Sequence, residues 1–394
     1  MKNPEQISPG VLCKGQLDVL IASGCLTSIN FEPPETTPSA IDMRLGRKAW
    51  KLRHGQRVTT REFSKIQSQS DEIKPSSDEF GEYFSFEAGS IYLVELDHVL
   101  ELPPNISGRA TGKSSIGRLD VITRLVTINS REYDLVGPGA AERLHLLLMP
   151  QTFSIRIEPG ESVNQLRLFS GPQCSATISS ELVRHYGTPF WYYKQSNGDL
   201  ERWPGNLDDV DLHRLTADPH LFDLTVDLAD PDYPHVYKAR KLPTATLDIR
   251  KKYLAKNGKY DPTAFFEAAP IDRADRSVVL EPDSFYIMKS RERLAIPNDV
   301  AVEVIAISER IGDIRIHYAG FAHPGFGRAG KGKQNGTPLI FEVRATDMST
   351  KLYDDSLLAR VQLFRMSKEA VPESSDYEGQ ELKLSKVFNE WPKV

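Results

Sequence analysis

The chain has 394 residues, of which 40% are hydrophobic and 26% are charged, and its formal net charge is −5. This length and composition are those of two soluble globular domains. The negative net charge offers no overall attraction for nucleic-acid phosphates, and no stretch approaches ~18 uninterrupted apolar residues, so we expect neither a nucleic-acid partner nor a membrane span.

Targeting and cysteine signals indicate the cytoplasm. The opening residues MKNPEQISPG lack the apolar region of a signal peptide. The three cysteines, Cys13, Cys25 and Cys174, are scattered and form neither a disulfide framework nor a CxxC pair. We therefore expect a protein of the reducing cytoplasm.

Short strands dominate the predicted elements. Residues 10–27 have roughly helical spacing and reach a glycine, which predicts one short helix. Most later segments are short, rich in Val, Ile, Leu, Tyr and Phe, and interrupted by Pro and Gly, for example SIYLVEL, RLHLLLM, AVEVIAI and PLIFEV. The pattern predicts an all-β barrel or sandwich-like fold with a few short helices. The polar stretch from about Ser367 is expected to fray or to act as a lid.

The chain contains two similar stretches, residues 90–121 and 284–316, in which Tyr92 matches Tyr286 at an offset of 194. Such self-similarity predicts a duplicated domain. Further matches are Pro103 with Pro297, Ile116-Gly117 with Ile311-Gly312, Pro38-SAIDMR with Pro243-TATLDIR, and the QLRLF that ends at Phe169 with the RVQLF that ends at Phe364. The predicted organisation is a first repeat over 1–171, a connector over 172–205, a second repeat over 206–370 and a C-terminal segment over 371–394.

The strongest chemical signal is the cluster Lys113-Ser114-Ser115-x-x-Arg118, which follows Gly112. Cations and hydroxyls beside glycines suit phosphate oxygens, because they supply charge-assisted hydrogen bonds and close backbone approach. The P-loop motif does not fit, since its first glycine would fall on a serine. An exposed polar turn with a surface salt bridge is the alternative.

The second stretch carries a different set of residues at the matching place. Alignment of the two Ile-Gly pairs sets Ser308, Glu309, Arg310 and Asp313 opposite the cluster. Carboxylates there would repel a triphosphate, so only the first repeat is predicted to bind phosphate.

The second repeat instead carries a carboxylate in an apolar run. Glu342 lies in TPLIFEVRA, and an offset of 193 sets it opposite Met149. Burial of a carboxylate is costly and raises its pKa, as suits a general acid or base. An outward-facing Glu342 paired with Arg344, two residues on, is the alternative. Between the two candidate sites, GFGRAG formally fits a dinucleotide fingerprint, but the residues after it cannot begin a helix.

Four segments together resemble the dCTP deaminase branch of the dUTPase-like superfamily, in its long duplicated form. They are SAIDMRLGRKAWKLR at 39–53, GKSSIGRLDV at 112–121, HYAGFAHPGFG with IFEVRA at 317–327 and 340–345, and YEGQELKLSK at 377–386. The resemblance implies a tandem of distorted β-barrels of the β-clip type. It also implies a hydrolase that acts on a cyclic amidine C–N bond and converts dCTP and water to dUTP and ammonia.

The resemblance assigns roles to residues of this chain. Glu342 would activate the water that attacks cytosine C4. Lys113, Ser114, Ser115 and Arg118 would hold the triphosphate, which would bring Mg²⁺ with it, and no zinc is expected, in keeping with the absence of a zinc-deaminase signature. The remaining base, sugar and lid positions implied by the family are His323, Ile340, Phe341, Tyr377 and Gln380. His323 departs from the family, which usually has an aspartate that binds the sugar 3′-hydroxyl.

The split of the motifs between repeats also implies an assembly. Lys113 to Arg118 in the first repeat and Glu342 in the second could form one composite site, so we expect a monomer or an oligomer of such composite units. Two alternative functions remain at this point. One is a dUTP diphosphatase, or a bifunctional enzyme that carries dCTP to dUMP. The other is a nucleotide-binding regulator without catalysis, suggested by His323.

Overall fold

A computed structural model shows two compact units. Unit 1 contains residues 1–175, 241–261 and 385–389, and unit 2 contains 176–240, 262–384 and 390–394. The structure describes residues 8–53, 63–127, 130, 132–179, 191–194, 200–203, 221–229, 234–242, 244–306, 314–316, 320–328, 336–345, 348–371 and 380–392. The side chains of 191–194, 200–203, 306 and 314–316 are outside the description.

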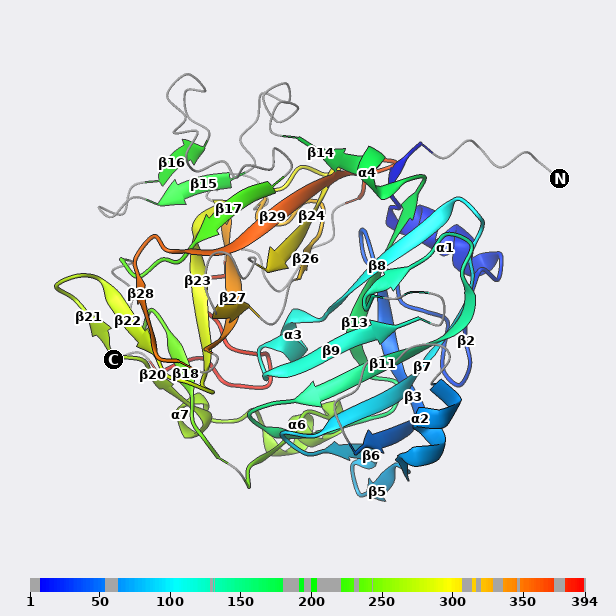
Figure 1. Ribbon diagram of the computed structural model, residues 1–394, viewed down its shortest axis with the longest axis horizontal. Helices are drawn as coiled ribbons and strands as arrows, with labels where there is room; N and C mark the ends of the chain where they lie inside the picture. The colour runs from blue at the N-terminus through cyan, green and yellow to red at the C-terminus, as the bar shows by residue number, and fades with distance from the viewer. Residues whose placement is uncertain are drawn as a thin grey trace. The chain divides into compact units, whose positions relative to one another are not determined.

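Unit 1 is built mainly from antiparallel strands (Figure 1). Its main sheet has the order β10-β8-β13-β3-β7-β11-β9, with β1, β2 and β4 attached to β13, β7 and β3, and a smaller sheet has the order β19-β12-β6-β5. The bounds are β1 Gly10–Val11, α1 Lys14–Ala22, β2 Leu26–Ser28, β3 Ile41–Leu52, α2 Phe63–Gln69, β4 Asp71–Ile73, β5 Ser76–Asp78, β6 Gly81–Phe86, β7 Ile91–Glu101, β8 Ile106–Gly112, α3 Ser114–Gly117, β9 Val121–Val126, β10 Leu135–Val136, β11 Ala141–Pro150, β12 Ser154–Ile157, β13 Ser162–Ser170, α4 Gln173–Ala176, β19 Thr246–Asp248 and α6 Lys251–Asn257.

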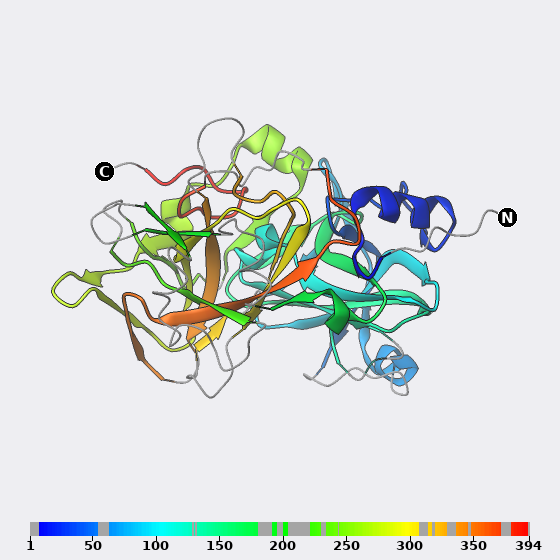
Figure 2. The same cartoon turned by 90° about the horizontal axis from the view of Figure 1, so that it is seen from above.

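The predicted N-terminal helix is α1, which lies beside the strands of unit 1 in both views (Figure 1, Figure 2). It buries Leu17 and Leu20, and the Gln16 side chain accepts a hydrogen bond from the Cys13 N–H at 3.0 Å, which caps the first turn. The helix is shorter than the predicted range because Leu26–Ser28 forms β2 instead.

Unit 2 has three groups of paired strands. One is β14-β29-β24-β26 with β17 on β29, the second is β16-β15-β23-β18-β20 with β27 on β23 and β25 on β27, and the third is β21-β22-β28. The bounds are β14 Thr177–Ile178, β15 Trp191–Lys194, β16 Leu200–Trp203, β17 Leu221–Thr225, β18 Tyr237–Ala239, α7 Pro262–Phe265, β20 Phe266–Ala268, β21 Ile271–Asp272, β22 Ser277–Leu280, β23 Phe285–Leu294, β24 Val300–Ala306, β25 Ile314–Ile316, β26 Phe321–Ala322, β27 Thr337–Ala345, β28 Thr350–Tyr353 and β29 Leu357–Arg365.

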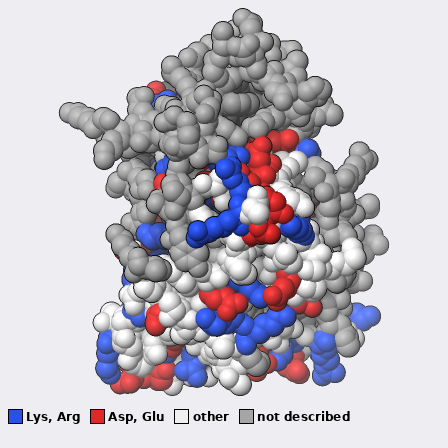
Figure 3. All heavy atoms as spheres, turned by 90° about the vertical axis from the view of Figure 1, so that its left-hand side faces the viewer, with Lys and Arg blue, Asp and Glu red and all other residues white. Residues whose placement is uncertain are grey.

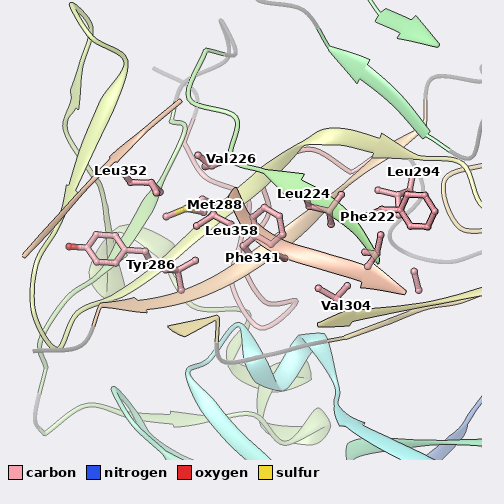
Figure 4. Packing of buried hydrophobic residues seen from close by; sticks show 14 of the residues in the cluster. Phe222, Leu224, Val226, Tyr286, Met288, Leu294, Val304, Phe341, Leu352 and Leu358 are labelled. Carbon is pink, nitrogen blue, oxygen red and sulfur yellow. The ribbon is translucent and has the colours of Figure 1, made fainter. Parts of the chain in front are cut away.

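A hydrophobic cluster fills the interior of unit 2 between these groups of strands. The members labelled in Figure 4 come from β17, β23, β24, β27, β28 and β29, with Val226 just after β17. Strand alternation places every second residue of these strands in the cluster, for example Tyr286 and Met288 on β23, and Phe341 and Val343 on β27. The intervening residues of β27 therefore lie on its other face.

The two units share a pattern of strand pairing. β7 pairs β11 with Tyr92 opposite Leu148, and β23 pairs β27 with Tyr286 opposite Val343. A matching hydrogen bond accompanies each pair. The N–H of Glu87 donates to the Tyr92 hydroxyl oxygen at 2.9 Å, and the N–H of Glu281 donates to that of Tyr286 at 2.8 Å. The offset of 194 seen in the sequence thus relates residues with the same local partners.

The match of Pro38-SAIDMR with Pro243-TATLDIR is wrong, because the two segments pair with different strands. In unit 1, Ile41 of β3 pairs with Leu166 of β13, whereas in unit 2 it is Phe222 of β17 that pairs with Val361 of β29. The segment that follows residue 243 forms β19, which pairs in parallel with β12 of unit 1. A short motif shared by two segments cannot reveal which strand each will join.

The units also differ from the predicted domains. Residues 176–179 and 191–203 of the predicted connector belong to unit 2, where β14 pairs β29 and β15 pairs β23. Residues 241–261 and 385–389 belong to unit 1. Chain order therefore does not separate the units cleanly.

The predicted mainly-β class with a few short helices is confirmed. Within the described part of the chain, no helix is long and apolar enough to cross a membrane. On the face drawn in Figure 3, basic and acidic side chains are interspersed. Ion pairs among the described residues of unit 2 include Lys238 with Glu281 at 2.7 Å and Arg240 with Glu267 at 3.0 Å.

Candidate active site

The predicted phosphate cluster forms a tight turn at the end of β8. Lys113 has extended backbone angles, and the single helical turn α3 starts after it. The Lys113 N–H donates to the Val163 carbonyl at 3.1 Å, and the carbonyl of Asp120 accepts from the Gln151 N–H at 2.8 Å. Asp120 has φ +56°, and the Thr152 hydroxyl donates to its carboxylate at 2.5 Å. Both ends of the turn are thus fixed to neighbouring strands.

The cluster is more than an exposed polar turn. Arg118 is 3% exposed and Ile116 is 4% exposed, whereas the Lys113 side chain is 24% exposed. The Lys113 ammonium donates a hydrogen bond to the carboxylate of Asp42, which also accepts from the Gln165 amide at 3.0 Å. Asp42 is a functional candidate that the motif search did not single out, although it lies in the SAIDMR segment quoted above.

Glu342 lies in the middle of β27 and is 2% exposed. It pairs across the sheet with Ile287, and neither residue is part of the hydrophobic cluster, so both lie on the opposite face of the sheet from Phe341. The alternative of an outward-facing, exposed carboxylate does not fit this burial. A carboxylate kept on an apolar strand needs a reason other than stability.

The counterpart of Glu342 in unit 1 differs from the predicted one. Glu342 pairs with Ile287, which matches Leu93 at the offset of 194, and Leu93 pairs with Leu147. Leu147, not Met149, is therefore the matching residue. The two-residue slip keeps the same face of the strand, so unit 1 has an apolar residue where unit 2 has a carboxylate.

Two buried cations lie on β23, beside the strand that carries Glu342. Lys289 pairs with Ile340 of β27, and its ammonium donates to Glu381 at 2.8 Å, while Arg293 donates to the other oxygen of Glu381 at 2.8 Å. Burial alone would raise the pKa of Glu381, but the hydrogen bond from Arg293 and the charge of Lys289 bring this pKa below its ordinary value. Glu381 follows the predicted lid residue Gln380, which is 9% exposed.

His323 begins a tight turn after β26. It is half-buried, and its carbonyl accepts from the Phe326 N–H at 3.1 Å, with Gly325 at φ +84°. Gly327 has φ +73°, and a Cβ built on it would meet the Leu294 carbonyl oxygen at 1.8 Å. The loop thus passes so close to the end of β23 that only glycine fits.

The remaining predicted residues lie either on β27 or outside the described part of the chain. Ile340 is half-buried and shares a face of β27 with Glu342, while the Phe341 side chain packs in the hydrophobic cluster. Tyr377, Ser308, Glu309, Arg310 and Asp313 lie outside the described residues. Within the described ranges, no group of three or more His, Cys, Asp or Glu is arranged to hold a metal ion.

Comparisons with known proteins agree with the fold. The sequence model of the "2'-deoxycytidine 5'-triphosphate deaminase (DCD) N-terminal domain" matches residues 8–172, and that of the corresponding C-terminal domain matches residues 213–388. A "dCTP deaminase, dUMP-forming" of Acidothermus cellulolyticus is 30% identical over 172 residues, which are 43% of this chain and 82% of that protein. The protein of the same name from Mycobacterium tuberculosis is 28% identical over 169 residues, 43% of this chain and 80% of that protein.

A solved structure resembles the chain over nearly its whole length. The crystal structure of 2′-deoxycytidine 5′-triphosphate deaminase from Agrobacterium tumefaciens has a TM-score of 0.75 and 27% sequence identity. The match covers 92% of this chain and 99% of that one. The fold and this structural match define a β-rich protein of the dUTPase-like class. Within that class, the chain belongs to the 2′-deoxycytidine 5′-triphosphate deaminase family, which is a family of enzymes.

Proposed function

We propose that the protein deaminates dCTP by hydrolysis, with Glu342 as the acid/base. The observation that carries the proposal is a carboxylate that is 2% exposed on an apolar strand of a dCTP deaminase family member. Glu342 would take a proton from water as the oxygen attacks C4 and pass it to the ring nitrogen N3. It would then take the second proton from the C4 hydroxyl of the tetrahedral intermediate and pass it to the amine, which leaves as ammonia when the C4–N bond breaks. One dCTP and one water give one dUTP and one ammonia. The general base would contribute about 10²–10⁴ to the rate.

The triphosphate would bind at the turn that follows β8. Lys113 and Arg118 would supply charge and Ser114 and Ser115 would supply hydroxyl donors to phosphate oxygens. Mg²⁺ would arrive with the nucleotide as part of the substrate. His323, Ile340 and the lid residues Tyr377 and Gln380 would contact the sugar and the base.

We further propose that the phosphate turn and Glu342 act on one nucleotide within one chain. Lys113 belongs to unit 1 and Glu342 to unit 2, and each repeat keeps only one of the two groups. Mixing two inactive variants, Lys113→Ala/Arg118→Ala and Glu342→Gln, tests this. The mixture should stay inactive, whether the active protein is a monomer or an oligomer of such chains. Regained activity would show that residues from different chains share a site.

Product analysis with Mg²⁺-dCTP tests the main proposal. We expect ammonia and dUTP in equal amounts from the wild type, and no ammonia from Glu342→Gln, which should still bind dCTP. Glu281→Gln is the matched control, because its half-exposed side chain pairs with Lys238 on the same unit. Binding without turnover by the wild type would favour a regulator instead.

A second candidate is the bifunctional reaction. The Acidothermus and Mycobacterium relatives are named as dUMP-forming. In that case dCTP and two waters would give dUMP, ammonia and pyrophosphate. Release of pyrophosphate in step with ammonia would identify this reaction, and its absence would leave dUTP as the product.

A further inference from the structure

The last described residues of unit 1 contact the phosphate turn directly. Ser385 is 3% exposed, and its hydroxyl donates a hydrogen bond to the Ser115 carbonyl oxygen at 2.8 Å. The two residues are 270 positions apart in the chain. Such a long-range bond holds only if the segment that carries Ser385 is itself fixed.

That segment, Ser385–Asn389, is fixed by a short stretch of parallel pairing. The Tyr260 N–H donates to the Val387 carbonyl at 3.0 Å, and the Asn389 N–H donates to the Tyr260 carbonyl at 2.9 Å. The Phe388 ring lies 6.2 Å from the Tyr260 ring, and Val387 and Phe388 are buried.

Tyr260 is anchored in turn to β19. Its hydroxyl accepts from the Asp248 N–H at 2.8 Å, and the Asp248 carboxylate binds the guanidinium of Arg250 at 2.6 Å. Arg250 also binds Asp78 of β5 with two hydrogen bonds of 2.7 and 2.8 Å, and it lies 4.4 Å from the centre of the Tyr83 ring. The contacts that fix the segment of Ser385 thus extend to β19 and β5 of the smaller sheet of unit 1.

The Ser115 carbonyl is a group that needs such a partner. It belongs to a helix of only four residues, and the last carbonyls of a helix have no partner within it. A single helical turn is unstable by itself because its nucleation is unfavourable. The bond from Ser385 therefore fixes the peptide plane that follows Ser115 and, with it, the backbone from which the Ser115 side chain projects.

We infer that Ser385 is a positioning residue for the triphosphate: it holds the Ser114–Ser115 turn in its binding conformation. The inference rests on the proposed function. It applies to the phosphates of the substrate, so its effect should depend on how many phosphates the nucleotide carries.

Calorimetric binding of dCTP and dCMP, together with steady-state kinetics, tests the inference. For Ser385→Ala we expect the KM for dCTP to rise about fivefold and kcat to change less than twofold, because one neutral hydrogen bond is lost. The preference for dCTP over dCMP should fall by a similar factor. Ser385→Thr, which keeps the hydroxyl, should restore both values.

Controls separate this role from folding and from the proposed function. Asn389→Ala removes a bond of 3.2 Å to the Lys259 carbonyl in the same segment without touching Ser115, so it should leave the KM unchanged. If Ser385→Ala does not fold, Ser385→Cys, a weaker donor of similar size, should give a smaller rise in the KM. The inference is overturned if a folded Ser385 variant prefers dCTP over dCMP by the same factor as the wild type does. Lack of dCTP binding by the wild type itself would instead overturn the proposed function.

Discussion

At the scale of single residues, the contrast between Leu147 and Glu342 carries the functional argument. The two residues hold matching positions on β11 and β27, and both are buried. In unit 1 the residue with the matching pairing partner is a buried leucine. A buried carboxylate costs desolvation free energy that leucine does not, so stability alone would select leucine at both positions.

Replacement of Glu342 by leucine should therefore separate stability from activity. We expect Glu342→Leu to leave the thermal midpoint unchanged or to raise it, because an apolar residue replaces a buried acid. Ammonia release from dCTP should fall below detection. Thermal denaturation and the ammonia assay measure the two quantities. A marked fall in the midpoint would mean that the carboxylate stabilises unit 2, and the functional argument from its burial would no longer hold.

At the scale of elements, the loop after β26 depends on one glycine. Gly327→Ala places a methyl group against the Leu294 carbonyl and forces an unfavourable φ. We expect unit 2 to lose at least about 3 kcal/mol in chemical denaturation. Gly320→Ala is the matched control, just before β26. Its Cβ would meet nothing within 4 Å, so it should change stability by less than about 0.5 kcal/mol.

The segment that contains β19 and α6 depends on Arg250. The Arg250 side chain is fully buried between two carboxylates, so Arg250→Ala leaves Asp248 unpaired. We expect faster hydrogen exchange in residues 244–261 and a loss of at least about 2 kcal/mol in unit 1. Lys256→Ala should change neither, because its pair with Glu79 at 3.0 Å is exposed. Unchanged exchange in Arg250→Ala would mean that β19 pairing alone holds the segment.

These elements also show which parts of the fold could be predicted from the sequence. Short apolar segments between turns predicted strands, and the Tyr92–Tyr286 match predicted residues with the same bonding partners, because local pattern and offset suffice for both. Pairing partners were beyond reach, because the partner of a strand is set by contacts across the whole chain. For that reason the segment after residue 243 was assigned to the wrong place. Ser385 was not singled out either, although it lies in the quoted YEGQELKLSK segment, because only the fold shows that it contacts the turn after Lys113.

The candidate site was predictable to the same extent. Lys113 and Glu342 stood out by residue type in their context, whereas Asp42, Lys289 and Glu381 did not. Charged residues on strands are common, and only the fold shows that Lys289 and Arg293 converge on one carboxylate.

At the scale of the whole molecule, one matched position distinguishes the response of the two units to pH. His98 of β7 and Glu292 of β23 are 194 residues apart and have the same role. The His98 Nε2 accepts from the Arg44 N–H at 2.9 Å, and the Glu292 carboxylate accepts from the Thr225 N–H at 2.8 Å. A histidine must lose a proton to accept this bond, whereas a carboxylic acid can accept it in either form.

His98 should make unit 1 less stable in acid. Burial, then the charge of Arg44, lowers the pKa of His98 from 6.5 to about 3. The unfolded chain therefore binds the proton more readily between these values, so stability falls as the pH falls below 6.5. His98→Gln keeps an acceptor without titration and should flatten this dependence. Hydrogen exchange of the β7 and β11 peptides from pH 5 to 8, corrected for intrinsic rates, measures it. An unchanged slope would show that His98 is already protonated in the folded state.

Glu292 should act in the opposite direction in unit 2. The Thr225 hydroxyl oxygen lies 2.9 Å from a Glu292 oxygen and 3.0 Å from an Asp355 oxygen, but one hydroxyl proton can serve only one of these contacts. A proton on Glu292 supplies the second. Burial raises the pKa of Glu292 from 4.5 to about 7. The hydrogen bonds from Thr225 oppose this rise and the charge of Asp355 adds to it. Asp355 itself pairs with Arg291 at 3.6 Å. Folding therefore favours the protonated acid.

The folded state binds this proton more tightly than the unfolded chain between pH 4.5 and 7, so unit 2 should lose stability as the pH rises through that window, by about 3 kcal/mol in all. Glu292→Gln, which keeps a donor toward Thr225 and carries no charge, should remove the loss. Exchange of the β23 and β27 peptides over the same pH range measures it, with His98→Gln as the control that leaves unit 2 unchanged. If wild type and Glu292→Gln exchange alike at pH 8, ionisation of Glu292 does not destabilise unit 2. The inference that the folded state holds a proton on Glu292 would then be wrong. If they differ as expected, acid weakens one unit and base weakens the other, and the pH of greatest stability for the chain lies where the two effects balance.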